Sequence, residues 1–180
     1  SFLVGNSHKL KEVEEREEYI DYLNKEISGI ISKMMVSETN EKTSELISLY
    51  FKMTGNIERI GDHAVNICDY TKIIEEKEIK FSRQARAELK EMKQICHNMF
   101  RYFQREIEDT KKWLEDLHEM ERFVDTKTQE FYNSHLMRMK RGECNDEACI
   151  IYSEMLVDFE RIGDHLWNMA KAMREIAEEV

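Results

Sequence analysis

The chain has 180 residues, which favours one domain over two, and 37 acidic against 27 basic side chains give it a formal net charge of −10 at pH 7. This charge disfavours a nucleic-acid backbone or an anionic membrane surface as partner and suits cations. The sequence has no proline and only six glycines, so it lacks the usual breaks of strand-and-turn folds.

Apolar residues recur at three- and four-residue spacing in five segments, and we expect each segment to be a helix. In chain order they run from Ser7 to Met35, from Glu41 to Glu76, onward from Ser82, from about Asp109 or Thr110 to Met139, and from the N-cap Asn145 to near the C-terminus. Helices of about 30 residues are roughly 45 Å long, so short connections make neighbours pack antiparallel. The predicted fold class is all-α, a helical bundle.

A hexapeptide, Glu-Arg-Ile-Gly-Asp-His, occurs twice, in "NIERIGDHAVN" at 56–66 and in "DFERIGDHLWN" at 158–168. The preceding helices also correspond, because "EEYID" at 17–21 matches "ERFVD" at 121–125. The sequence therefore predicts a tandem repeat of three-helix bundles within a single domain, 1–180. The second repeat, 81–180, would have three helices.

The first repeat, 1–80, would have only two helices, so its leading helix is expected to be missing, with "SFLV" at 1–4 as its last turn. The apolar surface that this helix covered would then be hidden by a partner, by rearrangement or by another copy of the chain. We therefore expect a homo-oligomer.

Four Glu-x-x-x-Asp pairs place two carboxylates on one side of a helix. The pairs are Glu17 and Asp21, Glu58 and Asp62, Glu121 and Asp125, and Glu160 and Asp164. Each pair costs a few tenths of a kcal/mol by repulsion, which a hard or borderline multivalent cation bound through oxygen would offset. The alternative is an ordinary solvated acidic face, since the second helix projects Glu58 and Asp62 outward.

The repeated hexapeptide also contains a glycine, Gly61 or Gly163, which costs about 1 kcal/mol relative to alanine in a helix interior. A solvated face gives no reason for it, whereas a missing side chain lets a neighbouring helix or an ion come close. His63 and His165 point about 100° away from the preceding aspartates, so we expect them to support the site or lie on the surface rather than bind metal.

The four cysteines form no C-x-x-C pair and are too sparse for a disulfide scaffold, so we expect reduced thiols in a cytosolic setting and no thiolate zinc site. They are Cys68, Cys96, Cys144 and Cys149. No apolar run approaches the roughly 20 residues that span a bilayer, so direct insertion into lipid is not expected. The sequence shows no Gly-rich phosphate loop and no nucleophile with an orienting partner, and we predict that the protein is not an enzyme.

The stretches "ERIGDHAVNI", "FERIGDHLWNMA" and "EEYIDYLNKEI" resemble the PhoU family. The stretch "HLMRMKRGECNDEACIIYSEMLVDFERIGDH" more narrowly resembles the PhoU-like cytoplasmic domain that follows the membrane segments of bacterial sodium/phosphate cotransporters. The resemblance implies two three-helix bundles, metal clusters on their surface and a role in regulating phosphate uptake. It places the domain on the cytoplasmic side of the inner membrane, with the membrane portion of the transporter as partner.

Carried over residue by residue, the resemblance implies two metal sites. The first would use Glu17, Asp21, Glu58 and Asp62, and the second Glu121, Asp125, Glu160 and Asp164. Iron is the metal that the resemblance favours, with zinc, manganese or magnesium as alternatives.

Two other functions fit parts of the sequence. A helical scaffold could bind a basic protein partner through its acidic faces without any metal. A carboxylate-bridged di-metal oxidase is the second, but that fold uses Glu-x-x-His ligands that point into the bundle core, whereas here the acids project outward and histidine follows aspartate directly.

Overall fold

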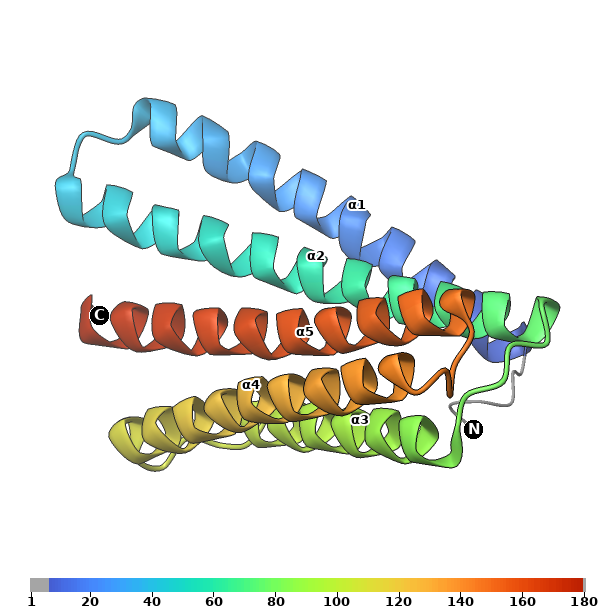
Figure 1. Ribbon diagram of the computed structural model, residues 1–180. Helices are drawn as coiled ribbons and strands as arrows, with labels where there is room; N and C mark the ends of the chain where they lie inside the picture. The colour runs from blue at the N-terminus through green and yellow to red at the C-terminus, as the bar shows by residue number, and fades with distance from the viewer. Residues whose placement is uncertain (1–6, 180) are drawn as a thin grey trace.

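The computed structural model describes residues 7–179, which form five helices, each antiparallel to the next (Figure 1). They are α1 (Ser7–Ser37), α2 (Glu41–Glu76), α3 (Arg83–Phe103), α4 (Thr110–Lys140) and α5 (Asp146–Glu179). This described part contains no strand, so the all-α prediction is confirmed. The last turn predicted at "SFLV" lies outside the described residues.

Four helices begin at a side chain that accepts a hydrogen bond from the backbone N–H three residues later, which satisfies an otherwise unpaired donor. These N-caps are Asn40, Ser82, Asp109 and Asn145. Helix α4 ends at Lys140, and the φ of +68° at the following Gly142 lets Glu143 N–H reach the Arg138 carbonyl at 3.0 Å. Polar caps in a sequence without proline therefore decide where the chain turns.

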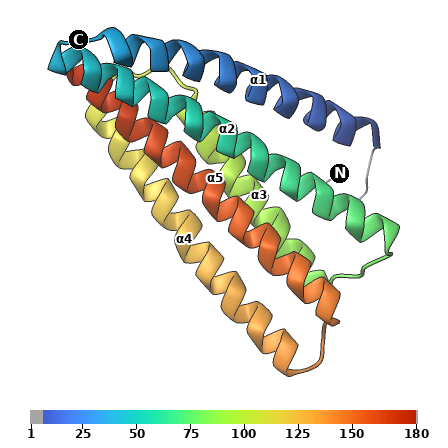
Figure 2. The same cartoon turned by 90° about the horizontal axis from the view of Figure 1, so that it is seen from above.

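The helices α3, α4 and α5 form a three-helix bundle, and α2 packs along the outer side of α5. Helix α1 contacts only α2 among the described helices, and both views place α2 between α1 and α5 (Figure 1, Figure 2). The largest side chains that are fully buried all belong to α3, α4 and α5: Tyr152, Leu89, Met92, Met99, Leu117, Met155, Leu156, Leu166 and Val124.

Helix α1, in contrast, exposes Tyr19, Tyr22, Ile30 and Met34. The core of the molecule thus sits in the α3–α5 bundle, and the division of the chain into two repeats stays a prediction. None of the helices within residues 7–179 combines the length and apolar character needed to cross a bilayer.

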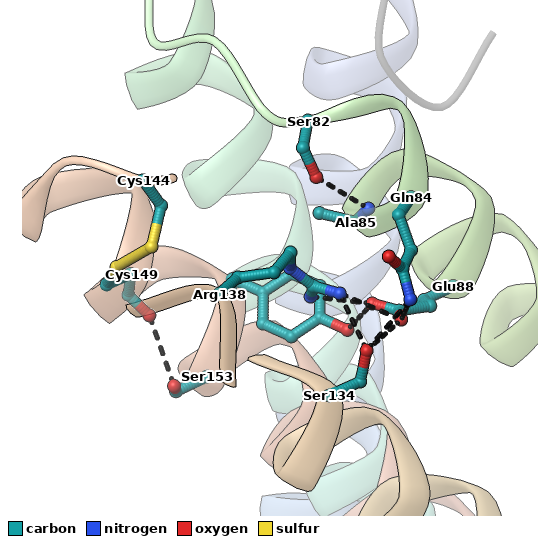
Figure 3. A network of polar contacts seen from close by, with 10 residues as sticks. Ser82, Gln84, Ala85, Glu88, Ser134, Arg138, Cys144, Cys149 and Ser153 are labelled. Carbon is teal, nitrogen blue, oxygen red and sulfur yellow. Dashed lines mark hydrogen bonds and ion pairs between the residues drawn. A yellow bond between two sulfur atoms is a disulfide. The ribbon is translucent and has the colours of Figure 1, made fainter. Parts of the chain in front are cut away.

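A buried ion pair fastens one end of this bundle (Figure 3). Arg138 of α4 donates to both carboxylate oxygens of Glu88 of α3, at 2.9 and 2.7 Å. Ser134 donates to the same carboxylate at 2.8 Å, and the Tyr152 hydroxyl of α5 also donates to it. Burial alone would raise the pKa of Glu88, but the hydrogen bonds from Arg138, Tyr152 and Ser134 lower it below its usual value.

Replacing Arg138 by methionine should lower the free energy of unfolding by about 3–5 kcal/mol, because it leaves a buried carboxylate without its cation. Wild-type stability from Glu88 is present above the ordinary carboxyl pKa and is lost as pH falls through the lowered folded pKa. In Arg138→Met, burial raises that pKa instead, so acidification should stabilise the variant. Urea unfolding at several pH values measures both effects, and a parallel pH dependence of the two proteins would contradict this account.

Candidate metal centres

The second predicted quartet comes together at the seam between α4 and α5. Carboxylate oxygens of Glu121 and Asp125 on α4 and of Asp164 on α5 all lie within 4.8 Å of one another. Glu160 lies one turn before Asp164 on α5, and the charges of Asp164 and Asp125 both act on it. The seam therefore brings carboxylates of two different helices into one cluster.

Neighbouring charges and burial raise the pKa of three members of this quartet. Burial is the larger cause for Glu121, followed by Asp125 and, more weakly, Asp164. Burial and then Asp164 raise the pKa of Asp125, and burial, Asp164 and Asp125 raise that of Glu160. Arg161 donates to Asp164 at 3.3 Å and neutralises part of the charge, but burial and mutual repulsion still raise the pKa of Glu121, Asp125 and Glu160. The cluster therefore fits a bound cation or bound protons.

The first predicted quartet is looser. Burial raises the pKa of Glu17 on α1, and the Asp62 carboxylate of α2 adds to the effect. Burial likewise raises the pKa of Glu58, with Asp62 and then Asp21 contributing. However, Lys25 donates to Asp21 at 2.7 Å, and within residues 7–179 no three oxygens of this quartet lie within 4.8 Å of one another. The two halves of the quartet face each other, but a lysine already neutralises part of its charge.

The two glycines of the repeated hexapeptide explain how the carboxylates meet. A Cβ on Gly163 would lie 3.3 Å from Cγ1 of Val124, which stands between Glu121 and Asp125 on α4. A Cβ on Gly61 would lie 3.6 Å from Cδ1 of Ile20, the residue before Asp21 on α1. At each seam a neighbouring helix, rather than an ion, occupies the space that the glycine leaves.

The histidines that follow the aspartates join α2 to α5. His63 Nδ1 lies 2.7 Å from Asp158 Oδ1, and His165 Nδ1 lies 2.9 Å from Asn56 Oδ1, while the two rings stack 5.5 Å apart. Of the two expected roles, supporting the site or lying on the surface, the second is excluded for His165, which is only 8% exposed. Their partners occupy equivalent positions in the two repeats, a signal that aligning the repeats could have revealed.

The expectation of four reduced thiols is wrong for one pair, because Cys144 and Cys149 form a disulfide with their Cα atoms 6.3 Å apart (Figure 3). Cys68 and Cys96 are free. The tight turn after α4 and the first turn of α5 bring the pair together, a geometry that a search for C-x-x-C does not detect. A ring nitrogen of His135, on the other side of the turn, lies within 4.8 Å of both sulfurs.

Comparison with known proteins gives one consistent result. The family model described as "PhoU domain" matches residues 1–71 and 89–173. The phosphate-specific transport system accessory protein PhoU homolog 1 of Thermotoga maritima is 28% identical over 172 residues, covering 92% of this chain and 72% of the relative. The crystal structure of PhoU from Pseudomonas aeruginosa superimposes with a TM-score of 0.72 at 18% identity, over 97% of this chain and 84% of that one.

Alanine at the two glycines should have unequal effects. Gly61→Ala should raise the free energy of unfolding by up to about 1 kcal/mol through helix propensity, because the contact it makes is an ordinary one. Gly163→Ala should gain nothing or lose stability, because the fully buried Val124 would have to move. Thermal unfolding of the metal-free variants measures the difference, and equal shifts would show that the α4–α5 seam is not tightly set.

Proposed function

This chain belongs to the PhoU family, and on that premise we propose that it is a metal-binding regulatory domain of phosphate uptake rather than an enzyme. The name of the Thermotoga relative, an accessory protein of a phosphate-specific transport system, supports the regulatory role. The observation that carries the metal-binding part is the cluster of Glu121, Asp125 and Asp164 with its raised carboxyl pKa values.

Carboxylate oxygens are the donors that hard and borderline cations take up, which fits iron first and also manganese, magnesium or zinc. A cation would relieve the repulsion between Asp125 and Asp164 and would tie α4 to α5. The quartet of Glu17, Asp21, Glu58 and Asp62 would act in the same way on α1 and α2. Because no three oxygens of this quartet lie within 4.8 Å of one another among residues 7–179, we expect this site to bind its metal less tightly.

The finer proposal is that the domain serves a sodium-dependent phosphate transporter on the cytoplasmic side of the bacterial inner membrane. The resemblance of the stretch 135–165 to domains of such cotransporters supports it. A partner role also suits the molecule's shape, because α1 presents exposed apolar side chains that another protein or a second copy would cover. The homo-oligomer stays a prediction.

Elemental analysis of protein purified without chelator or nickel resin tests the metal sites. We expect Asp125→Asn with Asp164→Asn to lose most of the metal held by the second quartet, and Asp21→Asn with Asp62→Asn to lose less. Glu115→Gln with Glu119→Gln removes the same charge from the exposed face of α4 and should keep the full metal content. Equal metal content in all four proteins would remove the site assignment and leave the metal-free scaffold as the better reading.

Acidification should release the metal from the second quartet, because protons compete for carboxylates whose pKa values lie above normal. In the metal-free protein, acidification should have the opposite effect and stabilise the fold. Since the ionised forms of these groups are destabilised by folding, its stability should rise as pH falls through the raised folded pKa values toward the ordinary ones. Isothermal titration with Mn²⁺ and thermal unfolding over the same pH range test the pair of trends, and a metal affinity independent of pH would contradict them.

Uptake of radiolabelled phosphate by cells carrying the full-length protein tests the regulatory role. If the domain regulates a sodium-dependent transporter, the Asp125→Asn, Asp164→Asn variant should change how uptake responds to external phosphate, and the effect should require sodium in the medium. The Glu115→Gln, Glu119→Gln control should behave as wild type. A sodium-independent effect would point to another class of phosphate transporter.

A further inference from the structure

A second cluster of metal-ligating side chains lies at the α4–α5 turn, about 16 Å along α5 from Glu160 at 1.5 Å per residue. Cys144 is in the turn, Cys149 is in the first turn of α5, and His135 is in the second half of α4. A ring nitrogen of His135 and the two sulfurs lie within 4.8 Å of one another. Nitrogen and sulfur in this combination differ chemically from the carboxylate clusters.

The buried ring of His135 also indicates a ligand site. Its side chain is only 2% exposed, yet its Nε2 has no hydrogen-bond partner among the described residues. The ring is held in place by Tyr152, whose ring centroid is 4.6 Å away. Burial lowers the pKa of His135 and the Arg138 charge lowers it further, while a hydrogen bond with the Cys149 backbone and the Glu88 charge oppose them.

Cys149 is buried at the start of α5 and lines a surface cavity. Cys149 donates its backbone N–H to the Asn145 carbonyl at the start of α5, and the positive end of a helix dipole favours a thiolate. A surface cavity of about 440 Å³ is lined by both Cys149 and His135, and Asp146 also lines it. The cavity leaves room for a fourth ligand, either water or the Asp146 carboxylate.

We propose that the reduced Cys144 and Cys149, together with His135, bind a thiophilic divalent cation such as Zn²⁺, and that the disulfide is the metal-free form of the same site. Two thiolates, one imidazole and one open position suit the four-coordinate geometry of zinc. A Cα–Cα distance of 6.3 Å suits a disulfide, and Cys144 lies in the turn between α4 and α5, outside both helices.

Reduction and metal binding convert the disulfide form into the zinc form. A small-molecule or protein dithiol supplies two electrons and two protons, the bond between the two sulfurs breaks, and the reductant itself becomes a disulfide. Zn²⁺ then displaces the two thiol protons, forming two S–Zn bonds and one N–Zn bond. Because the metal binds only the reduced form, it pulls the equilibrium toward the dithiol.

The site is coupled to the packing of the bundle. The Tyr152 ring that holds His135 also donates its hydroxyl to Glu88, and Arg138 lies 5.2 Å from the centre of the same ring. A metal bound to His135 would therefore restrain the Tyr152 ring, which belongs to the hydrogen-bond network that joins α3, α4 and α5 (Figure 3).

Cobalt titration of the phosphine-reduced protein tests the proposal, because Co²⁺ bound by thiolate gives a charge-transfer absorption that carboxylate sites lack. We expect one equivalent of Co²⁺ per chain to produce this band, and Zn²⁺ to abolish it. The disulfide form should show no band until a dithiol is added. The Asp125→Asn, Asp164→Asn variant should retain the band. The experiment therefore tests the cysteine–histidine site separately from the carboxylate sites.

Two variants and one control locate the ligands. Cys144→Ser changes a residue at a partly exposed turn and should abolish the band while leaving the helical circular dichroism unchanged. His135→Gln should weaken Co²⁺ binding at least tenfold. Cys68→Ser, which removes a free thiol elsewhere, should have no effect. A reduced wild type without the band, or a band that survives in Cys144→Ser, would overturn the proposal and leave the pair as a structural disulfide only.

Discussion

The close approach of paired helices at two glycines is the contact on which the rest of the structure depends. Gly163 lets Val124 of α4 seat against α5, and Gly61 lets Ile20 of α1 seat against α2. In each case the contacting residue directly precedes an aspartate of the partner pair. The distance between the helices thus decides whether four carboxylates share one site or remain separate surface charges. Apolar packing beneath the carboxylates offsets the repulsion between them.

The two seams are joined through α2 and α5, the helices that carry the repeated hexapeptide. Stacked His63 and His165 lie between them, but their partners differ, because Asp158 stands where the other repeat has Asn56. Asp158 also accepts from Asn66, and its second oxygen is buried without a partner among the described residues. The two halves of the duplication are therefore chemically unequal, because one histidine faces a carboxylate and the other an amide.

Helix α5 contributes residues to two clusters that offer different kinds of ligand atoms. Its middle contributes carboxylates, whose oxygens hard cations prefer, while its first turn contributes the sulfur of Cys149 beside the buried imidazole of His135, and softer cations prefer such ligand atoms. About three turns of helix lie between them. A single helix therefore contributes to two clusters whose ligand atoms differ in kind.

The sequence by itself determined the five helices and the N-cap at Asn145, because these depend on local periodicity and local hydrogen bonds. It also identified the eight carboxylates as two groups through the repeat and the family resemblance. Only the tertiary structure decided that the second quartet is tighter than the first, that the histidines face the α2–α5 seam, and that His135 meets Cys144 and Cys149. Those facts depend on how far apart helices lie and on which way they are rotated, and side-chain packing across the seams sets both.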